Sequence, residues 1–338
     1  MKRLLTAALV AACGCAWAAV TTAHVPRQLK ACVMQPPYAL DVADIEKSMQ
    51  WEFDALKKCD PSLDLIVLPE ASDRQARVGS REQAVAAAKK YNAPLLAACA
   101  ETAKRCQATV FVNALDFTPT GERNTTFAFD KTGACVGKYD KEHLTAGEWK
   151  KFGFDESYMW KWTEPKILEI DGVRYAFLTC YDFYFYENFA NIARYKPDVI
   201  IGCSHQRSDP HPVLESIGRY LAYNTGAYLV RASVSMGLDS KVGGCSMVVA
   251  PSGEMLGNMF SRVGTLTVEF DPHAKYLKPM GYGNPPGLHS TYIEVGRRPW
   301  KYRPAGSAII PGYRDAAKAG TTALPAGRYF HGRRPISM

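Results

Sequence analysis

The chain has 338 residues, of which 47% are hydrophobic and 22% are charged. This composition is typical of a globular protein with a sizeable core, and it excludes fibrous and disordered chains. The formal net charge is +8, but the tail from Arg297 onward holds nine basic residues and one acidic residue. Because no nucleic-acid-binding motif accompanies this charge, the sequence predicts no nucleic-acid partner. Contact between the tail and an anionic membrane surface stays open.

The first 18 residues have the layout of a secretory signal peptide. Lys2 and Arg3 precede an apolar run over residues 4–12, and small residues form an A-x-A pattern that ends at Ala18. We therefore expect an exported protein, periplasmic or secreted. A second interpretation places a lipid anchor on Cys13. No later segment approaches the ~20 apolar residues of a spanning helix, so no transmembrane span is predicted in the mature chain.

Strands and helices alternate along the rest of the chain. Residues 28–35 are predicted as a strand, 44–58 as a helix and 63–69 as an all-apolar central strand. Further helices are expected at 81–91, 189–195 and 213–223. Further strands are expected at 94–100, 108–115, 125–129, 134–139, 167–170, 173–178, 198–202, 227–234, 246–250 and 264–270. After residue 272 the composition predicts an irregular extension over the surface. The alternation indicates one α/β domain with layered sheets.

Eight cysteines follow the predicted signal peptide. In an exported protein some of them can form disulfides, and Cys99 and Cys106 are close enough in sequence to be a candidate pair. The spacings form no paired C-x-x-C pattern, so we expect no structural zinc.

Three reactive side chains follow predicted strands. Glu70 ends the run Leu-Pro-Glu, Lys141 lies in KYDKEHL (138–144), and Cys180 lies in LTCYD (178–182). A thiol at a strand-to-helix turn lies near the free N–H groups of the helix, where partial positive charge favours the thiolate. Each residue taken alone has a plain structural interpretation, a buried cysteine or a surface charge. The ordered combination favours a catalytic site.

These motifs resemble those of the nitrilase superfamily of carbon-nitrogen hydrolases. That family carries Pro-Glu after an apolar strand, K-Y-x-K-x-H-L, and Cys-Tyr-Asp or Cys-Trp-Glu. Other matching segments are Gln35, Asn124-Thr125, Phe185 with Glu187, 244–253, and Arg297-Arg298-Pro299 with Tyr302. The resemblance covers about residues 28–303 and leaves 304–338 as a basic extension. It implies a four-layer α-β-β-α sandwich, a homodimer or higher homo-oligomer, and no metal or organic cofactor.

The resemblance also implies roles for the site residues. Amide hydrolysis needs an activated nucleophile, stabilisation of the carbonyl oxygen and proton transfer to the departing nitrogen. Cys180 is expected to form a thioester and Glu70 to act as the base. Lys141 and the N–H of Tyr181 are expected to stabilise the oxyanion, and Glu148 to position substrate. The predicted activity is hydrolysis of a non-peptide amide bond in a small molecule.

Several alternatives stay open. The same triad suits nitrile hydrolysis or N-acyl transfer, although Cys-Tyr-Asp favours an amide over a nitrile, and a catalytically silent binding module has the same fold. Many members carry an arginine where this chain has Tyr184, so recognition of a carboxylated amide through that position is not expected. The aromatic residues of 149–162 can rim a pocket or pack on the domain. A Cys-His protease using His143 or His205, and a metal held by His205, Asp209 and His211, are the less favoured interpretations.

Overall fold

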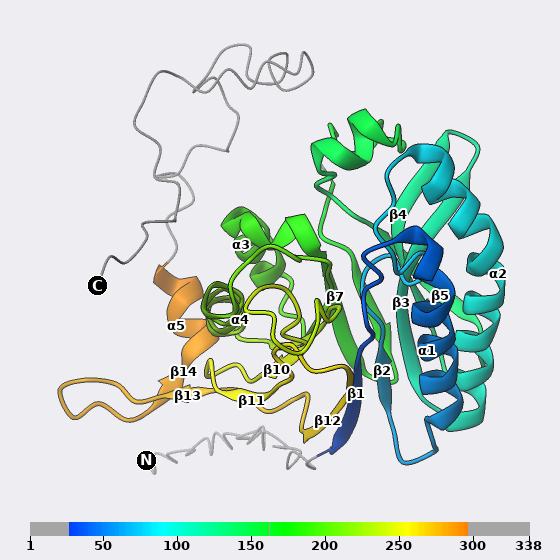
Figure 1. Cartoon of the computed structure of the whole chain (residues 1–338). Helices are drawn as coiled ribbons and strands as arrows, with labels where there is room; N and C mark the ends of the chain where they lie inside the picture. The colour runs from blue at the N-terminus through cyan, green and yellow to red at the C-terminus, as the bar shows by residue number, and fades with distance from the viewer. Residues whose placement is uncertain (1–26, 162, 297–338) are drawn as a thin grey trace, which may run out of the picture.

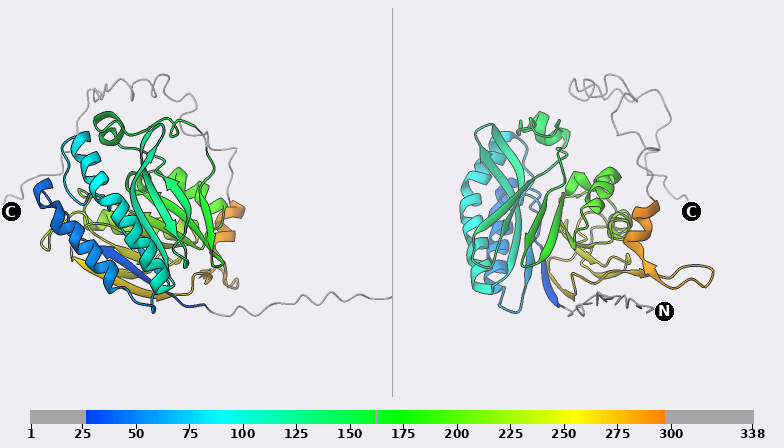
Figure 2. Two further views of the ribbon diagram at one scale, coloured as in Figure 1. Left: turned by 90° about the vertical axis from the view of Figure 1, so that its right-hand side faces the viewer. Right: turned by 180° about the vertical axis from the view of Figure 1, so that it is seen from behind.

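Two six-stranded sheets pack face to face in the computed structural model, which describes residues 27–161 and 163–296. Helices cover the outer face of each sheet (Figures 1 and 2). The layers run α-β-β-α, which confirms the predicted architecture. The predicted signal peptide (1–18), the end of the predicted domain near residue 303 and the basic extension (304–338) lie outside the described residues.

The first sheet has the strand order β12-β1-β2-β3-β4-β5. Its strands are β1 (Leu29–Gln35), β2 (Leu65–Val67), β3 (Thr109–Thr118), β4 (Gly121–Phe129), β5 (Cys135–Asp140) and β12 (Gly264–Phe270). β1, β2 and β3 are parallel, and the other neighbours are antiparallel. Helices α1 (Ile45–Lys58) and α2 (Arg81–Cys106) cover this sheet, and the turn η1 (Val42–Asp44) precedes α1.

The second sheet has the order β11-β10-β9-β8-β7-β6. Its strands are β6 (Ile167–Ile170), β7 (Val173–Thr179), β8 (Val199–Cys203), β9 (Tyr228–Ala232), β10 (Met247–Val249) and β11 (Met255–Asn258). β7, β8 and β9 are parallel. Helices α3 (Tyr186–Arg194) and α4 (His211–Thr225) cover its outer face, and the short helices η2 (Gly147–Lys151) and η3 (Cys180–Tyr184) flank the site.

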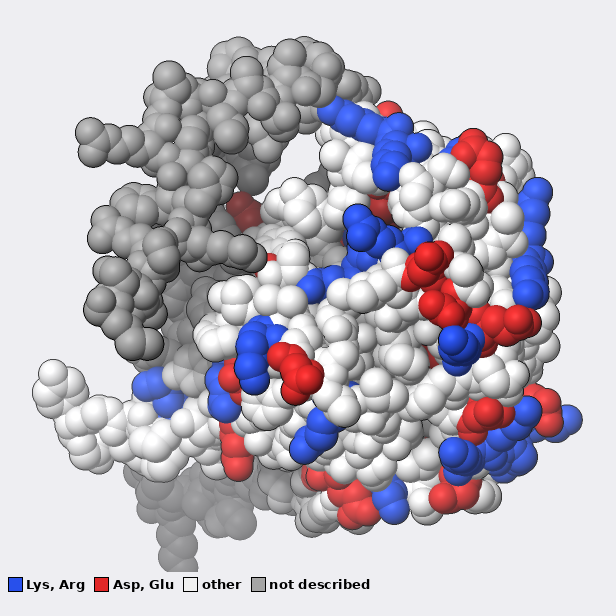
Figure 3. Space-filling model, in the orientation of Figure 1, with Lys and Arg blue, Asp and Glu red and all other residues white. Residues whose placement is uncertain are grey.

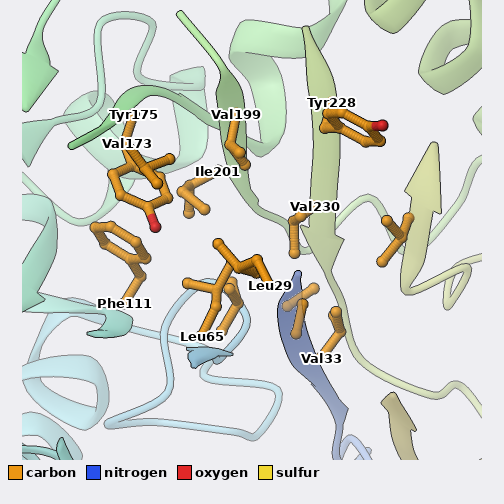
Figure 4. Packing of buried hydrophobic residues seen from close by; sticks show 14 of the residues in the cluster. Leu29, Val33, Leu65, Phe111, Val173, Tyr175, Val199, Ile201, Tyr228 and Val230 are labelled. Atoms are coloured by element: carbon orange, nitrogen blue, oxygen red, sulfur yellow. The ribbon is translucent and has the colours of Figure 1, made fainter. Parts of the chain in front are cut away.

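The core has three layers, which explains why the central strands are apolar throughout. Along β1, Leu29 and Val33 face the second sheet, whereas Cys32 and Met34 face α1 and α2. Figure 4 shows side chains of both sheets, among them Phe111 and Tyr175, meeting between them. A third cluster packs the second sheet against α3 and α4. A strand buried on both faces reads as a continuous hydrophobic run.

The prediction of a strand over 94–100 is wrong, because these residues continue helix α2. Leu95 and Cys99 are buried four residues apart and extend the buried face of the helix. Pro94 lies inside the helix but on its exposed side. Packing of the buried face therefore outweighs the ~3 kcal/mol that an interior proline costs.

The segment after residue 272 is more regular than predicted. It contains the short antiparallel pair β13 (Leu277–Lys278) and β14 (Gly287–Leu288), followed by helix α5 (His289–Gly296). His289 anchors this segment, since its Nε2 lies 2.9 Å from the backbone oxygen of Tyr223 in α4. No helix within the described ranges is both long and apolar enough to cross a membrane.

All eight cysteines of the described ranges are unpaired. The bridge considered between Cys99 and Cys106 is excluded, because both lie on α2 seven residues apart. At a rise of ~1.5 Å per residue their Cα atoms are ~10 Å apart, beyond the reach of a disulfide.

Charged side chains of both signs are interspersed over the face drawn in Figure 3. This mixture agrees with the sequence, in which the basic excess belongs to the two ends of the chain and not to the domain between them.

Candidate active site

The three predicted catalytic residues follow strands that end at one edge of the sandwich. Glu70 comes shortly after β2, Lys141 directly after β5, and Cys180 directly after β7. Because β5 runs in the same direction as β2, the ends of both strands lie at the same edge of the first sheet. The structure therefore brings together residues that are up to 110 positions apart in the sequence.

Lys141 forms the centre of a buried ion cluster. Its Nζ lies 2.8 Å from Glu70 Oε1 and 2.8 Å from Glu148 Oε2. Only 1% of the Lys141 side chain is exposed. Burial opposes the charged ammonium, but the charges of Glu148, Glu70 and Cys180 outweigh it and raise the pKa of Lys141 well above its usual value. Lys141 is thus a permanent cation held between two carboxylates.

Glu148, whose spacing from the lysine fitted the family only approximately, lies in the cluster. It is the second residue of η2, and its Oε2 also accepts a 2.8 Å hydrogen bond from the backbone N–H of Thr145. Its Oε1 accepts a 2.7 Å bond from Asn124 Nδ2. The short helix and the loop before it therefore fix this carboxylate against Lys141.

Asn124 is a site residue whose role the sequence did not reveal. Its Nδ2 donates to Glu70 Oε1 at 2.8 Å as well as to Glu148. Its Oδ1 accepts a 2.7 Å bond from Asn113 Nδ2, which fixes the orientation of the amide. The only signal in the sequence was the Asn-Thr pair, which matched the family without a function attached to it.

Glu70 links the ion cluster to the thiol. Burial acts to raise the pKa of its carboxyl, but the charge and hydrogen bond of Lys141, the Asn124 amide and a hydrogen bond with the Cys180 thiol together hold this pKa below its usual value. Glu70 is therefore an ionised carboxylate in contact with the thiol, as a general base must be.

Cys180 stands at a sharp turn between β7 and η3. Its φ angle is +47°, in the left-handed region that residues other than glycine seldom adopt. Burial first, and then the charge of Glu70, raise the pKa of the thiol, whereas Lys141 and a backbone hydrogen bond from His205 act in the opposite direction. Burial and Glu70 therefore outweigh the preference for the thiolate that free helix N–H groups would give. The helix that follows is a five-residue 3-10 turn, and burial beside a carboxylate dominates.

Asp182 fixes this turn to the rest of the site. The buried carboxylate accepts hydrogen bonds from the backbone N–H of Thr179 at 2.9 Å, the backbone N–H of His143 at 2.9 Å and the hydroxyl of Tyr139 at 2.8 Å. Two of these donors belong to the β5 segment that carries Lys141. Asp182 therefore ties the turn that holds the thiol to the strand that presents the ammonium.

Tyr181 is the residue directly after Cys180 in η3. Its side chain is 37% exposed and packs edge-to-face on Phe185, with ring centroids 5.1 Å apart. Any contribution of Tyr181 to the oxyanion thus comes from its backbone.

Neither nearby histidine is placed as the base of a Cys-His pair. His143 Nδ1 lies 2.9 Å from Asp182 Oδ1, and His205 Nε2 lies 2.9 Å from Gln75 Oε1. Burial and the charges of Arg207, Arg74 and Lys141 push the pKa of His205 well below its usual value, so its ring is neutral. Only the His205 backbone contacts the thiol.

The metal cluster considered at His205, Asp209 and His211 does not form. Within 27–161 and 163–296, no group of three or more His, Cys, Asp or Glu side chains is arranged to hold an ion. The Asp209 carboxylate instead accepts hydrogen bonds from Tyr184 and Gln206.

The aromatic residues between Lys141 and Cys180 pack on the domain. Phe154 is buried in a small cluster with Ala84 of α2 and Leu115 of β3, and Trp149 and Phe152 lie against it. Trp162, predicted to belong to the same loop, lies outside the described residues. Of the two uses considered for this loop, packing is the one that the contacts support.

Comparison with solved structures shows the same fold. An amidase from Nesterenkonia sp. aligns with a TM-score of 0.56 and 21% identity over 72% of this chain and 90% of that one. Saccharomyces cerevisiae Nit3, a member of the nitrilase superfamily, aligns with a TM-score of 0.57 and 18% identity over 80% of this chain and 94% of that one.

Two curated Mycobacterium tuberculosis proteins, both named hydrolases, are each 26% identical over 174 residues, which cover 46% of this chain and 61% of theirs. The alignment thus spans less than two thirds of these relatives. The family model described as carbon-nitrogen hydrolase matches residues 9–275, most of the chain. The match agrees with the motifs, the layered fold and the cluster at the strand ends, and the chain belongs to the carbon-nitrogen hydrolase family.

Proposed function

We propose that this protein is an amidase that cleaves a non-peptide amide through a thioester on Cys180. The observation that carries the proposal is the contact of the buried Glu70 carboxylate with both the Lys141 ammonium, at 2.8 Å, and the Cys180 thiol. The Glu70 carboxylate thereby links the cation to the nucleophile, and these three groups supply the activated thiol and the charge stabilisation that amide cleavage uses.

In the first half of the proposed reaction, Glu70 takes the thiol proton as the sulfur attacks the amide carbon. The thiol does not ionise beforehand, because burial and the charge of Glu70 raise its pKa. Negative charge then develops on the carbonyl oxygen, where Lys141 and the N–H of Tyr181 stabilise it. Protonated Glu70 gives its proton to the nitrogen, the C–N bond breaks, and the amine or ammonia leaves an acyl thioester on Cys180.

In the second half, water replaces the amine. Glu70 takes a proton from the water, whose oxygen attacks the thioester carbon, and the C–S bond breaks to release the carboxylic acid and restore the thiol. Glu148 is assigned to substrate positioning. Its Oε1 accepts one bond in the structure, from Asn124, and a carboxylate oxygen has room for a second, here the amide N–H of the substrate.

A structural relative supports the nucleophile assignment. A mutant of the amidase from Nesterenkonia sp. AN1, 20% identical with a TM-score of 0.59, shows covalent addition of the acetamide moiety of fluoroacetamide at its active site cysteine. The chemistry is that protein's own. At this level of identity the comparison supports only the assignment of an equivalent reactive cysteine here.

The test is a panel of small amides, with nitriles and N-acyl amines included, in which release of nitrogen is followed. The wild type is expected to hydrolyse at least one amide and to carry the acyl mass on Cys180 under rapid quenching, whereas Cys180→Ala does neither. Equal behaviour of the two proteins across the panel, with no adduct, would contradict the proposal. Added hydroxylamine measures how much of the thioester is transferred to an amine instead of water.

We also propose export to the periplasm or the medium and assembly into a homodimer or larger homo-oligomer. Export rests on the pattern of residues 1–18, and assembly on the family resemblance. Sequencing the N-terminus of the processed protein is expected to give Ala19, while a lipidated Cys13 would support the anchored form. Light scattering of the purified protein is expected to give at least twice the mass of one chain, and a monomer would contradict assembly.

A further inference from the structure

Arg207 lies on the loop that follows β8. Two residues earlier on this loop, His205 makes a backbone hydrogen bond to the Cys180 thiol. The His205 ring packs edge-to-face on Tyr38, with centroids 5.4 Å apart. The Arg207 guanidinium lies over the Tyr38 ring, with Cζ 4.6 Å from the ring centre. Its Nη1 donates a hydrogen bond to the Tyr38 hydroxyl. Arg207 is thus linked to Cys180 through only two residues.

Among residues 27–161 and 163–296, Arg207 has no acidic partner. None of the ion pairs among the described residues includes it, and its one hydrogen bond goes to the neutral hydroxyl of Tyr38. A guanidinium has five N–H donors in a planar arrangement that matches a carboxylate. The residue is half-buried, and an ionic contact made by a partly buried guanidinium is stronger than one in bulk water.

The charges that act on Tyr38 are mostly basic: three arginines oppose one acidic group, Glu70. Arg77 is exposed, likewise has no ion pair among the described residues, and acts on Tyr38 together with Arg207. The nearest acidic group on the same loop, Asp209, accepts hydrogen bonds from Tyr184 and Gln206. Arg74 also lies close by, but Asp73 neutralises it.

We propose that Arg207 is a specificity-determining residue that binds a carboxylate on the amide substrate, so that the substrates of this enzyme are anionic amides. The inference rests on the proposed amidase function and specifies its substrate class. Family members that hold a substrate carboxylate often use an arginine four residues after the nucleophile, where this chain has Tyr184. The loop after β8 here supplies a guanidinium from a different element.

The first test compares paired substrates. Monoamides of dicarboxylic acids, graded in length, are compared with uncharged alkyl amides of the same length, and N-acyl amino acids place the carboxylate on the amine side instead. Wild type is expected to prefer one carboxylated series at least tenfold in kcat/KM over its uncharged partner. Arg207→Gln is expected to lose about 10- to 100-fold for the carboxylated substrate, mainly through KM, and to stay within about twofold for the uncharged one.

Arg207→Lys and Arg219→Gln are the matched variants. Lysine keeps the charge without the planar donors, so Arg207→Lys is expected to fall between wild type and Arg207→Gln. Arg219 is an exposed arginine of α4 bonded to the backbone oxygen of Gly253, and its replacement is expected to change neither series. Equal kcat/KM for charged and uncharged amides in wild type, or equal losses for both in Arg207→Gln, would overturn the inference.

A second readout needs no turnover. Iodoacetate and iodoacetamide alkylate the same thiol and differ in charge, so the ratio of their rates at Cys180 reports the potential beside it. Arg207→Gln is expected to lower the iodoacetate-to-iodoacetamide ratio severalfold relative to wild type, and an unchanged ratio would contradict the role of Arg207. Failure of the proposed function is distinguishable, since it appears as no nitrogen release and no acyl adduct from either substrate series.

Discussion

The two sheets contribute different chemical groups to the site. Segments that follow strands of the first sheet carry the charges: Glu70 after β2, and Lys141 and Glu148 after β5. The turn after β7 in the second sheet carries the thiol of Cys180. The first group is bound together by hydrogen bonds of 2.7–2.8 Å, and it contains two carboxylates and one ammonium.

This difference accounts for the raised pKa of the Cys180 thiol. The charges of the first sheet already sum to −1, so a free thiolate would add a second negative charge to a buried site. In the proposed mechanism, Cys180 loses its proton only as its charge passes to the carbonyl oxygen of the substrate. In the proposed reaction, Glu70 of the first sheet accepts the proton and Cys180 of the second sheet donates the electron pair. The contact between Glu70 and Cys180 couples the two steps.

The largest expected effect comes from removing the cation of the first group. Lys141→Gln leaves Glu70 and Glu148 buried without their partner, so the free energy of unfolding should fall by about 3–5 kcal/mol. Turnover should fall on the order of 10³-fold, because oxyanion stabilisation is lost. Denaturant unfolding and amide turnover measure the two effects.

Lys138→Gln is the matched control, since Lys138 lies on β5, three residues before Lys141, but is 48% exposed and pairs with Asp116 at the surface. Its replacement should cost less than about 1 kcal/mol. Equal stability of the two variants would contradict the assignment of Lys141 as the buried centre of the cluster.

Glu70→Gln tests two effects of the Glu70 carboxylate, its action as the base and its effect on the pKa of Cys180. Acylation should slow by about 10²- to 10⁴-fold, because no base takes the thiol proton. The pKa of Cys180 should fall at the same time, because the negative charge that raises it is gone. The pH at which iodoacetamide alkylation of Cys180 reaches half its maximal rate should move down, and it should stay in place in Glu101→Gln on the exposed side of α2. An upward shift would contradict the account.

Asp182→Asn weakens the connection between the two sheets without touching the reacting groups. The amide keeps the size of the carboxylate but loses the charge that holds the N–H groups of Thr179 and His143. We expect kcat to fall about 10- to 100-fold with little change in KM, because the thiol is misplaced by a fraction of an ångström. Tyr139→Phe removes only one donor to Asp182 and should have a smaller effect, so an effect larger than that of Asp182→Asn would contradict this order.

The smallest effect concerns like charges across the two sheets. Burial, and then the charge of Asp182, raise the pKa of Glu142 to about 7. The folded protein therefore binds a proton that the unfolded chain, with a pKa of about 4.5, has released, and stability should fall as the pH rises from about 4.5 to about 7. Glu142→Gln should reduce this fall, as measured by unfolding at pH 5 and pH 8. An unchanged pH dependence would show that Glu142 is not the group responsible.

Most strands, and the strand ends that carry the three proposed catalytic residues, could be predicted because both depend on local sequence. The apolar runs before Glu70 and Cys180 identify buried strands, and a reactive residue directly after such a strand lies at the edge of the sheet. The helix over 94–100 could not be predicted, because the four-residue spacing of Leu95 and Cys99 fits both a strand and a helix. The helix is favoured only when the first sheet is present for α2 to pack against.

What the sequence could not supply depends on contacts across long separations. The protonated state of Cys180 follows from burial beside Glu70, and the tether at Asp182 joins segments about 40 residues apart. Arg207 reaches Tyr38, 169 positions away. No spacing rule indicates such a pair, because the two loops meet only when both sheets have formed.

The most direct test of the central claim is the rate at which an acyl group appears on Cys180 in a single turnover, measured by rapid quenching and intact mass spectrometry. Wild type should form an adduct on Cys180 alone, and Glu70→Gln should form it at least about 100-fold more slowly even though its thiol is more readily ionised. An adduct on another cysteine, or equal acylation rates in the two proteins, would contradict the claim that a carboxylate of the first sheet activates the thiol of the second.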